Sequence, residues 1–147
     1  MVGSISHSKG CAIAVAARQS RYLGLGIDIE RLQTESSARK IAPQILGESE
    51  LRQLPEAGRA FLVSLAFSAK ESLFKALYPA VQQFQGFHAA AFSFDGDRQQ
   101  ACLELAVDWS AQWRCGQRFP VRFFCRDGFI LTCTAIAAIS CRSEMSG

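Results

Sequence analysis

Three carboxylates and two lysines are arranged in this sequence in a way that suits the binding of a metal ion and a polyphosphate. Asp28 and Glu30 alternate inside an apolar run, and on a strand they would point to the same face with Cα atoms roughly 6–7 Å apart. Glu71 lies about forty residues further along, between Lys70 and Lys75 on a helix-like segment. Three carboxylates from two elements would give Mg²⁺ oxygen ligands and leave positions for water and phosphate oxygens. The lysines would bind a pyrophosphate as point charges.

Each of these stretches also has a simpler interpretation when it is taken alone. Asp28 and Glu30 could face water at the edge or end of a strand, because charged residues are usually exposed. Glu71 and Lys75 are four residues apart, so they could form an ordinary ion pair on one face of a helix. Two glycines earlier in the first run leave room for a ligand or another backbone to approach closely. The combination of both stretches in this order favours a binding site.

A third polar segment precedes the first predicted strand and contains Ser6 and His7. Hydroxyls, an imidazole and backbone amides together could bind a phosphate group. A polar turn with a histidine facing water is the alternative. The sequence has no Gly-x-Ser-x-Gly motif, so we do not expect a Ser/His/Asp triad.

Length and composition indicate one globular domain that covers residues 1–147. No apolar run reaches the roughly 18 residues of a membrane span, and the first residues lack the pattern of a signal peptide, so we expect a cytoplasmic protein. A net charge of +3 without a dense basic stripe argues against nucleic-acid binding. Basic residues near the motifs instead favour a phosphorylated ligand or an acidic protein partner.

Six cysteines are present, but their spacing contains no Cys-x-x-Cys pair and four of them lie in apolar, strand-like runs. We expect them to be reduced and mostly buried, where they act as small hydrophobic residues. With only two histidines in the chain, a zinc site is not expected.

The elements that would position these residues can be read from hydrophobic periodicity and turn residues. Residues 11–17 and 22–30 resemble two strands of an antiparallel hairpin, and 36–46 and 48–54 resemble short helices. The strongest helix runs from about residue 57 to 77, and Pro79 is expected to end it. Further strands are expected at 90–94, 101–107, 119–126 and 129–138, with a tight turn at Asp127-Gly128. The order predicts an α+β fold in which a largely antiparallel sheet packs against the long helix.

Three motifs, taken together and in order, resemble the 4'-phosphopantetheinyl transferases of the Sfp and enterobactin-synthase type. They are Ser6-His7-Ser8, the run Gly26-Ile27-Asp28-Ile29-Glu30, and the helix segment Lys70-Glu71-Ser72-Leu73-Phe74-Lys75. The resemblance covers about residues 2–80. It implies transfer of the phosphopantetheine arm of coenzyme A to a serine of an apo acyl or peptidyl carrier protein, with release of adenosine 3',5'-bisphosphate.

The resemblance also implies roles for individual residues. The expected Mg²⁺ ligands are Asp28, Glu30 and Glu71. The expected contacts to coenzyme A are Ser6, His7, Lys70 and Lys75. Glu71 would be the base for the incoming serine, with Glu30 as a competitor, and Lys75 would also act in catalysis. The carrier protein would bind at about residues 33–47, where Arg39 and Lys40 could meet acidic residues and the apolar contacts would be Ile41, Ile45 and Leu46.

One departure from the family concerns the first half of the protein. Members of this group are usually pseudo-dimers of two similar halves, and this chain begins almost at the Ser-His-Ser motif. It therefore resembles one half-module, the C-terminal part of the pseudo-dimer. Self-association into a homo-oligomer could rebuild the cleft. The alternative is a non-catalytic remnant that binds coenzyme A or a carrier protein without turnover.

Overall fold

The computed structural model describes residues 1–138 and has the α+β fold that the sequence predicts. The predicted helices and strands are all present, and one additional strand precedes them. In chain order the elements are β1 (Val2–Ser8), β2 (Cys11–Ala17), β3 (Tyr22–Arg31), α1 (Glu35–Ile45), α2 (Glu48–Gln53), α3 (Arg59–Val81), the 3-10 turn η1 (Phe87–Ala89), β4 (Ala90–Asp95), β5 (Gln100–Leu105), β6 (Arg118–Arg126) and β7 (Phe129–Ala137).

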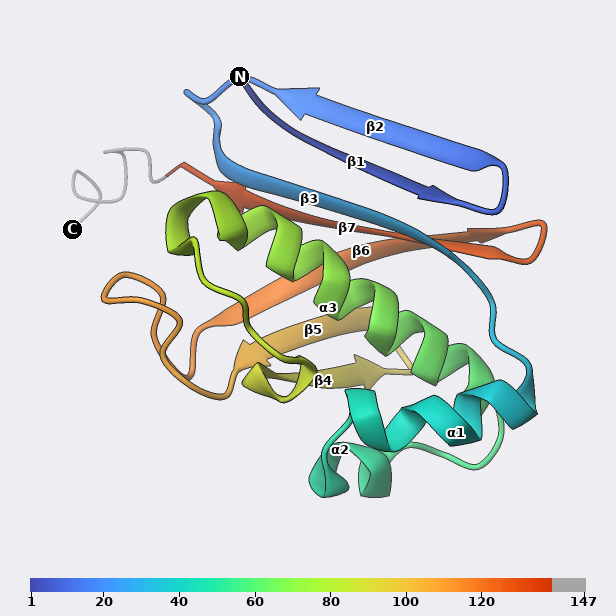
Figure 1. Cartoon of the computed structure of the whole chain (residues 1–147). Helices are drawn as coiled ribbons and strands as arrows, with labels where there is room; N and C mark the ends of the chain where they lie inside the picture. Colours follow the sequence, from blue (N-terminus) through green and yellow to red (C-terminus); the bar gives the residue numbers. More distant parts are fainter. Residues whose placement is uncertain (139–147) are drawn as a thin grey trace.

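Five strands form an antiparallel sheet in the order β3-β7-β6-β5-β4. The tight turn predicted at Asp127-Gly128 joins β6 to β7, and both residues have positive φ angles of 52° and 77°. Figure 1 shows α3 lying along one face of this sheet, with α1 and α2 near one end of α3. The prediction of an antiparallel sheet covered by the long helix is therefore confirmed.

The first hairpin differs from the prediction. β2 pairs with β1 in a separate two-stranded sheet, while β3 pairs with β7, so the predicted pairing of 11–17 with 22–30 is wrong. The turn of the actual hairpin is Lys9-Gly10, whose positive φ angles of 42° and 84° suit a tight hairpin. The short link 18–21 reverses the chain direction, but it does not determine which strand becomes the hydrogen-bonded neighbour of β3.

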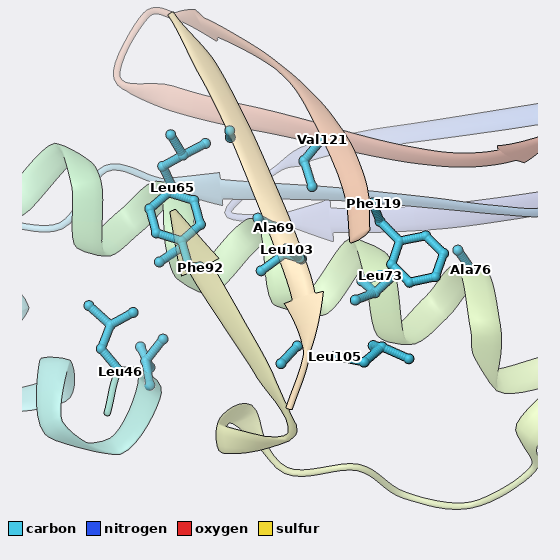
Figure 2. Close-up of a cluster of buried hydrophobic side chains, with 14 of the residues drawn as sticks. Leu46, Leu65, Ala69, Leu73, Ala76, Phe92, Leu103, Leu105, Phe119 and Val121 are labelled. Carbon is cyan, nitrogen blue, oxygen red and sulfur yellow. The ribbon is translucent and has the colours of Figure 1, made fainter. Parts of the chain in front are cut away.

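The core lies between α3 and the sheet. Side chains along the buried side of α3 pack against β4, β5 and β6, as Figure 2 shows. Burial at these positions, at about 25 cal/mol per Å² of apolar surface, is the main stabilisation of the helix on the sheet. The labelled members of this cluster are Leu46, Leu65, Ala69, Leu73, Ala76, Phe92, Leu103, Leu105, Phe119 and Val121.

α3 continues past Pro79, so the prediction that this proline ends the helix is wrong. Proline removes one backbone donor, and so close to the C-terminus of a helix that loss affects a single hydrogen bond. The helix ends at Gln82, which has a left-handed φ of 54° and whose N–H donates to the Tyr78 carbonyl. Among the helices of residues 1–138, none has the length and apolar character of a membrane span.

The cysteines of the described residues are free thiols, but they are less buried than predicted. Cys115 and Cys125 are exposed, while Cys11, Cys102 and Cys133 are half-buried. The prediction of mostly buried cysteines is therefore wrong for these five. Four of them lie on strands that show one face to solvent, and Cys115 lies in a turn between β5 and β6. The sixth, Cys141, lies outside the described residues.

Candidate active site

The helix that carries Glu71 lies directly on the backbone of the strand that carries Asp28. A Cβ atom built on Gly26 would lie 1.7 Å from the carbonyl oxygen of Ser72, and one on Gly24 would lie 2.3 Å from that of Ala76. Only glycine permits such an approach between a helix and a strand. The two glycines of β3 thus bring α3 close enough for its side chains to meet the strand's carboxylates.

Buried hydroxyl groups fix α3 against the neighbouring strand β7. The hydroxyl groups of Ser68 and Thr132 are 2.8 Å apart, and those of Ser72 and Thr134 are 2.9 Å apart. All four residues are buried, and unpaired hydroxyls there would be costly. The two serines are one helical turn apart on α3, and the two threonines are two residues apart on β7. These hydrogen bonds therefore fix the rotation of α3 about its axis.

Asp28 is the buried centre of the candidate site, with a side chain only 4% exposed. Its Oδ1 atom accepts hydrogen bonds from Lys75 Nζ at 3.3 Å and from the Ser6 hydroxyl at 3.4 Å. Lys75 also donates to the backbone carbonyl of Ile27 at 3.0 Å. The other carboxylate oxygen, Oδ2, is buried and has no hydrogen-bond partner. A buried carboxylate oxygen without a partner is a place where a cation would be favourable.

Glu30 and Glu71 complete the carboxylate group. Burial, followed by the charges of Asp28 and Glu71, raises the pKa of Glu30 from its ordinary value of 4.5 to about 7. Burial, followed by the charge of Asp28, also raises the pKa of Glu71, and Lys75 opposes this effect. The three carboxylates are therefore near enough to repel one another, and one lysine does not neutralise them.

These residues fit a hard divalent cation by their chemistry, although they do not yet stand in coordinating positions. Within residues 1–138, no three His, Cys, Asp or Glu side chains are already arranged to hold a metal ion. Without a cation, mutual repulsion separates carboxylates and favours their protonation. The unpartnered oxygen of Asp28 and the raised pKa values of Glu30 and Glu71 are what a site built for an additional positive charge would show.

The raised pKa of Glu30 gives a prediction about pH. Because its pKa in the folded protein lies above its ordinary value, the unfolded state ionises first, and the stability of the metal-free protein should fall as pH rises from about 4.5 to 7. A divalent cation requires the ionised carboxylate, so metal affinity should rise over pH 6–8 with proton release. Calorimetric Mn²⁺ titrations in buffers of different ionisation enthalpy measure both the metal affinity and the number of protons released. Glu30→Gln should reduce the proton release, and pH-independent binding without proton release would contradict the prediction.

Lys70 does not join the carboxylates. Its ammonium group is buried and donates to Glu50 Oε1 at 2.9 Å, to the carbonyl of Ile45 at 2.6 Å and to that of Phe87 at 2.8 Å. Glu50 also accepts from the N–H groups of Gly47 and Phe92. Burial lowers the pKa of Lys70, and Glu50 opposes that shift. With three protein acceptors around it, this lysine links α3 to the α1–α2 corner, to η1 and to β4.

Glu50 is the residue that sequence reasoning missed. In the sequence it is one of two acidic residues in the first turn of the helix that begins at Glu48, which is a common pattern and does not single it out. The signal that could have identified it is the presence of a lysine on an otherwise apolar stretch of α3, because such a buried cation needs an anionic partner.

Replacing Lys70 with methionine should lower the free energy of unfolding by about 3–5 kcal/mol, because Glu50 would remain buried without its cation. Thermal or urea denaturation measures this loss. Lys40→Met, at an exposed position of α1, is the matched control and should change stability little. If Lys70→Met instead raised the Michaelis constant for coenzyme A without changing stability, Lys70 would be a phosphate ligand, as the sequence predicted.

Ser6 and His7 are separated by the strand that carries them. β1 directs successive side chains to opposite faces, so Ser6 is buried against β3 whereas His7 is exposed. The segment is thus a strand and not the polar turn considered as the alternative. Of the predicted site residues, the structure brings together Asp28, Glu30, Glu71, Lys75 and Ser6.

The predicted carrier-binding segment needs a correction. Ile45 and Leu46 are 2% and 1% exposed, so they belong to the core and cannot contact a partner without unfolding. Their predicted contact with the carrier followed from the family resemblance, whereas packing of the end of α1 against the core buries both side chains. Arg39 and Lys40 are exposed on α1, and Ile41 is half-buried beside them.

An aromatic niche adjoins the carboxylates. It is a cavity of about 90 Å³ beside Glu71, with Phe74, Phe84, Phe87 and Trp109 among its lining residues. The ring of Phe74 lies 5.7 Å from that of Phe84, in an edge-to-face arrangement. The indole N–H of Trp109 donates to the carbonyl of Ala89, which fixes this ring. The niche provides apolar surface immediately next to the charged groups.

Comparisons with known proteins identify the family that this chain resembles. Enterobactin synthase component D of Salmonella typhimurium is 40% identical over 93 residues, which are 61% of this chain and 37% of that protein. The 4'-phosphopantetheinyl transferase Npt of Nocardia iowensis is 29% identical over 146 residues, 93% of this chain and 65% of Npt. The chain thus spans about a third to two thirds of the length of these curated relatives.

The fold is also found in a solved structure. A holo-(acyl-carrier-protein) synthase from Bacillus anthracis, in complex with CoA (3',5'-ADP), superimposes with a TM-score of 0.57 at 21% identity, over 81% of this chain and 99% of that one. The sequence profile of the 4'-phosphopantetheinyl transferase superfamily matches residues 24–133, which include most of β3, all of α3 and all three carboxylates. The chain therefore belongs to the 4'-phosphopantetheinyl transferase superfamily.

Proposed function

We propose that this chain transfers the 4'-phosphopantetheine group of coenzyme A to a serine of an apo carrier protein and releases adenosine 3',5'-bisphosphate, in a reaction that depends on Mg²⁺. The observation that carries the proposal is the buried, unpartnered Oδ2 atom of Asp28 beside two carboxyl groups of raised pKa. Membership of the superfamily supports the reaction class. The subtype, a holo-(acyl-carrier-protein) synthase or an enzyme of peptide or siderophore synthesis, is part of the proposal, as is a cytoplasmic location.

The roles of the residues follow from their positions. Asp28, Glu30 and Glu71 would hold Mg²⁺, which when bound would neutralise charge on the pyrophosphate of coenzyme A. Lys75 is 29% exposed, so its ammonium group can reach a phosphate at the surface while it remains next to Asp28. Glu71 accepts the proton of the carrier serine, and Glu30 is the alternative. Either carboxylate is suited to act as this general base, because a pKa raised toward neutral pH makes a carboxylate a stronger base.

The aromatic niche is suited to the less polar part of the substrate. A molecule whose phosphates lie at Lys75 and the carboxylates would extend over Phe74, because Glu71 and Phe74 line the same cavity. Aromatic rings bind alkyl and amide groups by contact with their faces. We therefore place the pantetheine arm of coenzyme A in this niche.

The carrier protein would bind along α1. Arg39 and Lys40 are exposed there and would attract an acidic partner, which increases the association rate more than the affinity. Ile41 provides a neighbouring apolar contact. Ser6 and His7 were predicted to contact coenzyme A; of these, His7 is exposed and free to meet a phosphate, whereas Ser6 faces Asp28.

A second candidate function is binding of coenzyme A or a carrier protein without turnover. The observation that favours it is that no three carboxylates of residues 1–138 are already arranged to hold a metal ion. Self-association into a homo-oligomer is part of the same proposal, because a second copy could contribute surface to the site.

The test is to incubate the purified chain with coenzyme A, Mg²⁺ and an apo carrier protein, and to measure the intact mass of the carrier. A gain of one phosphopantetheine group that chelator and Glu71→Gln abolish would support the transferase. Binding of coenzyme A without any mass gain, tested with several carriers and a folded protein, would support the second candidate. Absence of both would refute both functions.

A further inference from the structure

β1 is joined to β3 by serine hydroxyl groups and not by its backbone. The N–H of Ile27 donates to Ser4 Oγ at 3.0 Å, and the N–H of Ile29 donates to Ser6 Oγ at 3.0 Å. The two serines lie on the same face of β1 because side chains alternate along a strand, and the N–H groups they accept are also two residues apart. The spacing of the two hydroxyls thus matches the spacing of the two N–H groups at the edge of β3. This match fixes the register of β1 against β3.

The two serines differ in one contact. The hydroxyl of Ser6 also donates to Asp28 Oδ1 at 3.4 Å, whereas Ser4 forms no hydrogen bond with a carboxylate of residues 1–138. Lys75 Nζ approaches the same Oδ1 atom from α3 at 3.3 Å. One carboxylate oxygen of Asp28 is therefore held by groups from two elements, and Oδ2 remains buried without a partner. Groups that hydrogen-bond to a metal-binding carboxylate in this way set the orientation of the carboxylate and its affinity for the cation.

We propose that Ser6 is a positioning residue for Asp28: by holding Oδ1, it keeps Oδ2 free as the oxygen available to a divalent cation. The inference rests on the metal site of the proposed function. It replaces the phosphate contact predicted for Ser6 from the sequence, because the residue is only 6% exposed and its hydroxyl already has both a donor and an acceptor. A carboxylate turns readily about its last side-chain bond. Loss of one contact to Oδ1 would therefore let the Asp28 carboxylate turn away from the orientation that leaves Oδ2 free.

The test compares Ser6→Ala with Ser4→Ala, using Mn²⁺ as the probe and calorimetry or electron paramagnetic resonance as the readout. Both variants remove one acceptor for a β3 N–H group, so both should lose similar thermal stability. Only Ser6→Ala should weaken Mn²⁺ binding, by about tenfold, and Mg²⁺ competition should show the same loss. Ser6→Thr, which keeps the hydroxyl, should restore the affinity. If the alanine variant does not fold, Ser6→Cys keeps the shape with a weaker donor and gives the same comparison.

Several outcomes would overturn the inference. Equal Mn²⁺ affinities for the two alanine variants would mean that Ser6 only joins the strands. Unchanged Mn²⁺ affinity with weaker binding of adenosine 3',5'-bisphosphate would restore the phosphate contact. If the wild-type chain did not bind Mn²⁺, or if Asp28→Asn bound it equally well, the metal site of the proposed function would fail and the inference with it.

Discussion

Replacing Gly26 with alanine should unfold the protein or lower its free energy of unfolding by about 4–5 kcal/mol, at the upper end of single-residue effects. The added Cβ would lie 1.7 Å from the Ser72 carbonyl oxygen and 2.7 Å from the Ala76 nitrogen, both backbone atoms of α3. Neither can rotate away as a side chain would. The helix would have to lift from β3, which would also break the hydrogen bond between Ser72 and Thr134. Chemical denaturation followed by circular dichroism measures the loss.

Gly86→Ala is the matched control for this substitution. Gly86 has a φ of −71°, which suits any residue, and a Cβ added there meets no atom within 4 Å. Its stability should therefore remain within about 0.5 kcal/mol of the wild type. If Gly26→Ala proved as stable as this control, the direct contact between α3 and β3 would not be what assembles the site.

Replacing Asp28 with asparagine should lower the rate of phosphopantetheine transfer by about 10²–10³-fold while the fold is retained. Asparagine keeps the shape and an oxygen that can accept from Ser6 and Lys75, but it removes the negative charge that a cation would need. The charge of Asp28 also contributes to the raised pKa of Glu30 and Glu71, so both pKa values should fall in the variant. The intact mass of the carrier as a function of time gives the rate.

Asp97→Asn removes the same charge from an exposed turn after β4 and should leave the rate unchanged. Two results would refute the role of Asp28. One is an unchanged rate in Asp28→Asn. The other is a large loss of thermal stability with metal binding intact, which would identify Asp28 as a structural partner of Lys75 rather than a ligand.

The site therefore depends on backbone packing as much as on its charged residues. Asp28 comes from a strand and Glu71 from a helix, and their approach is possible because β3 carries no Cβ at the two positions under α3. The hydroxyl pairs to β7 then set the rotation of α3. Charged groups placed on such rigid elements are held more accurately than groups on loops.

Local pattern in the sequence was sufficient for most of the elements, although not for β1 or the end of α3, and for the faces of Asp28, Glu30, Glu71 and Lys75. Alternation in the first run predicted a strand with both acids on one side, and helical spacing placed Glu71 and Lys75 together. The Asp127-Gly128 turn was also identified, because its positive φ angles restrict the residue types. These properties depend on neighbours within a few residues, so the sequence contains them directly.

Tertiary structure alone decided which elements meet and which side chains are buried. β3 pairs with β7, a hundred residues away in the chain, and the serines of β1 occupy its other edge. Lys70 and Glu71 are adjacent, yet one is buried with Glu50 and the other lies at the carboxylates, because consecutive residues on a helix point about 100° apart. Which of the two directions faces the core depends on the surfaces that pack against the helix, and those surfaces come from distant parts of the chain.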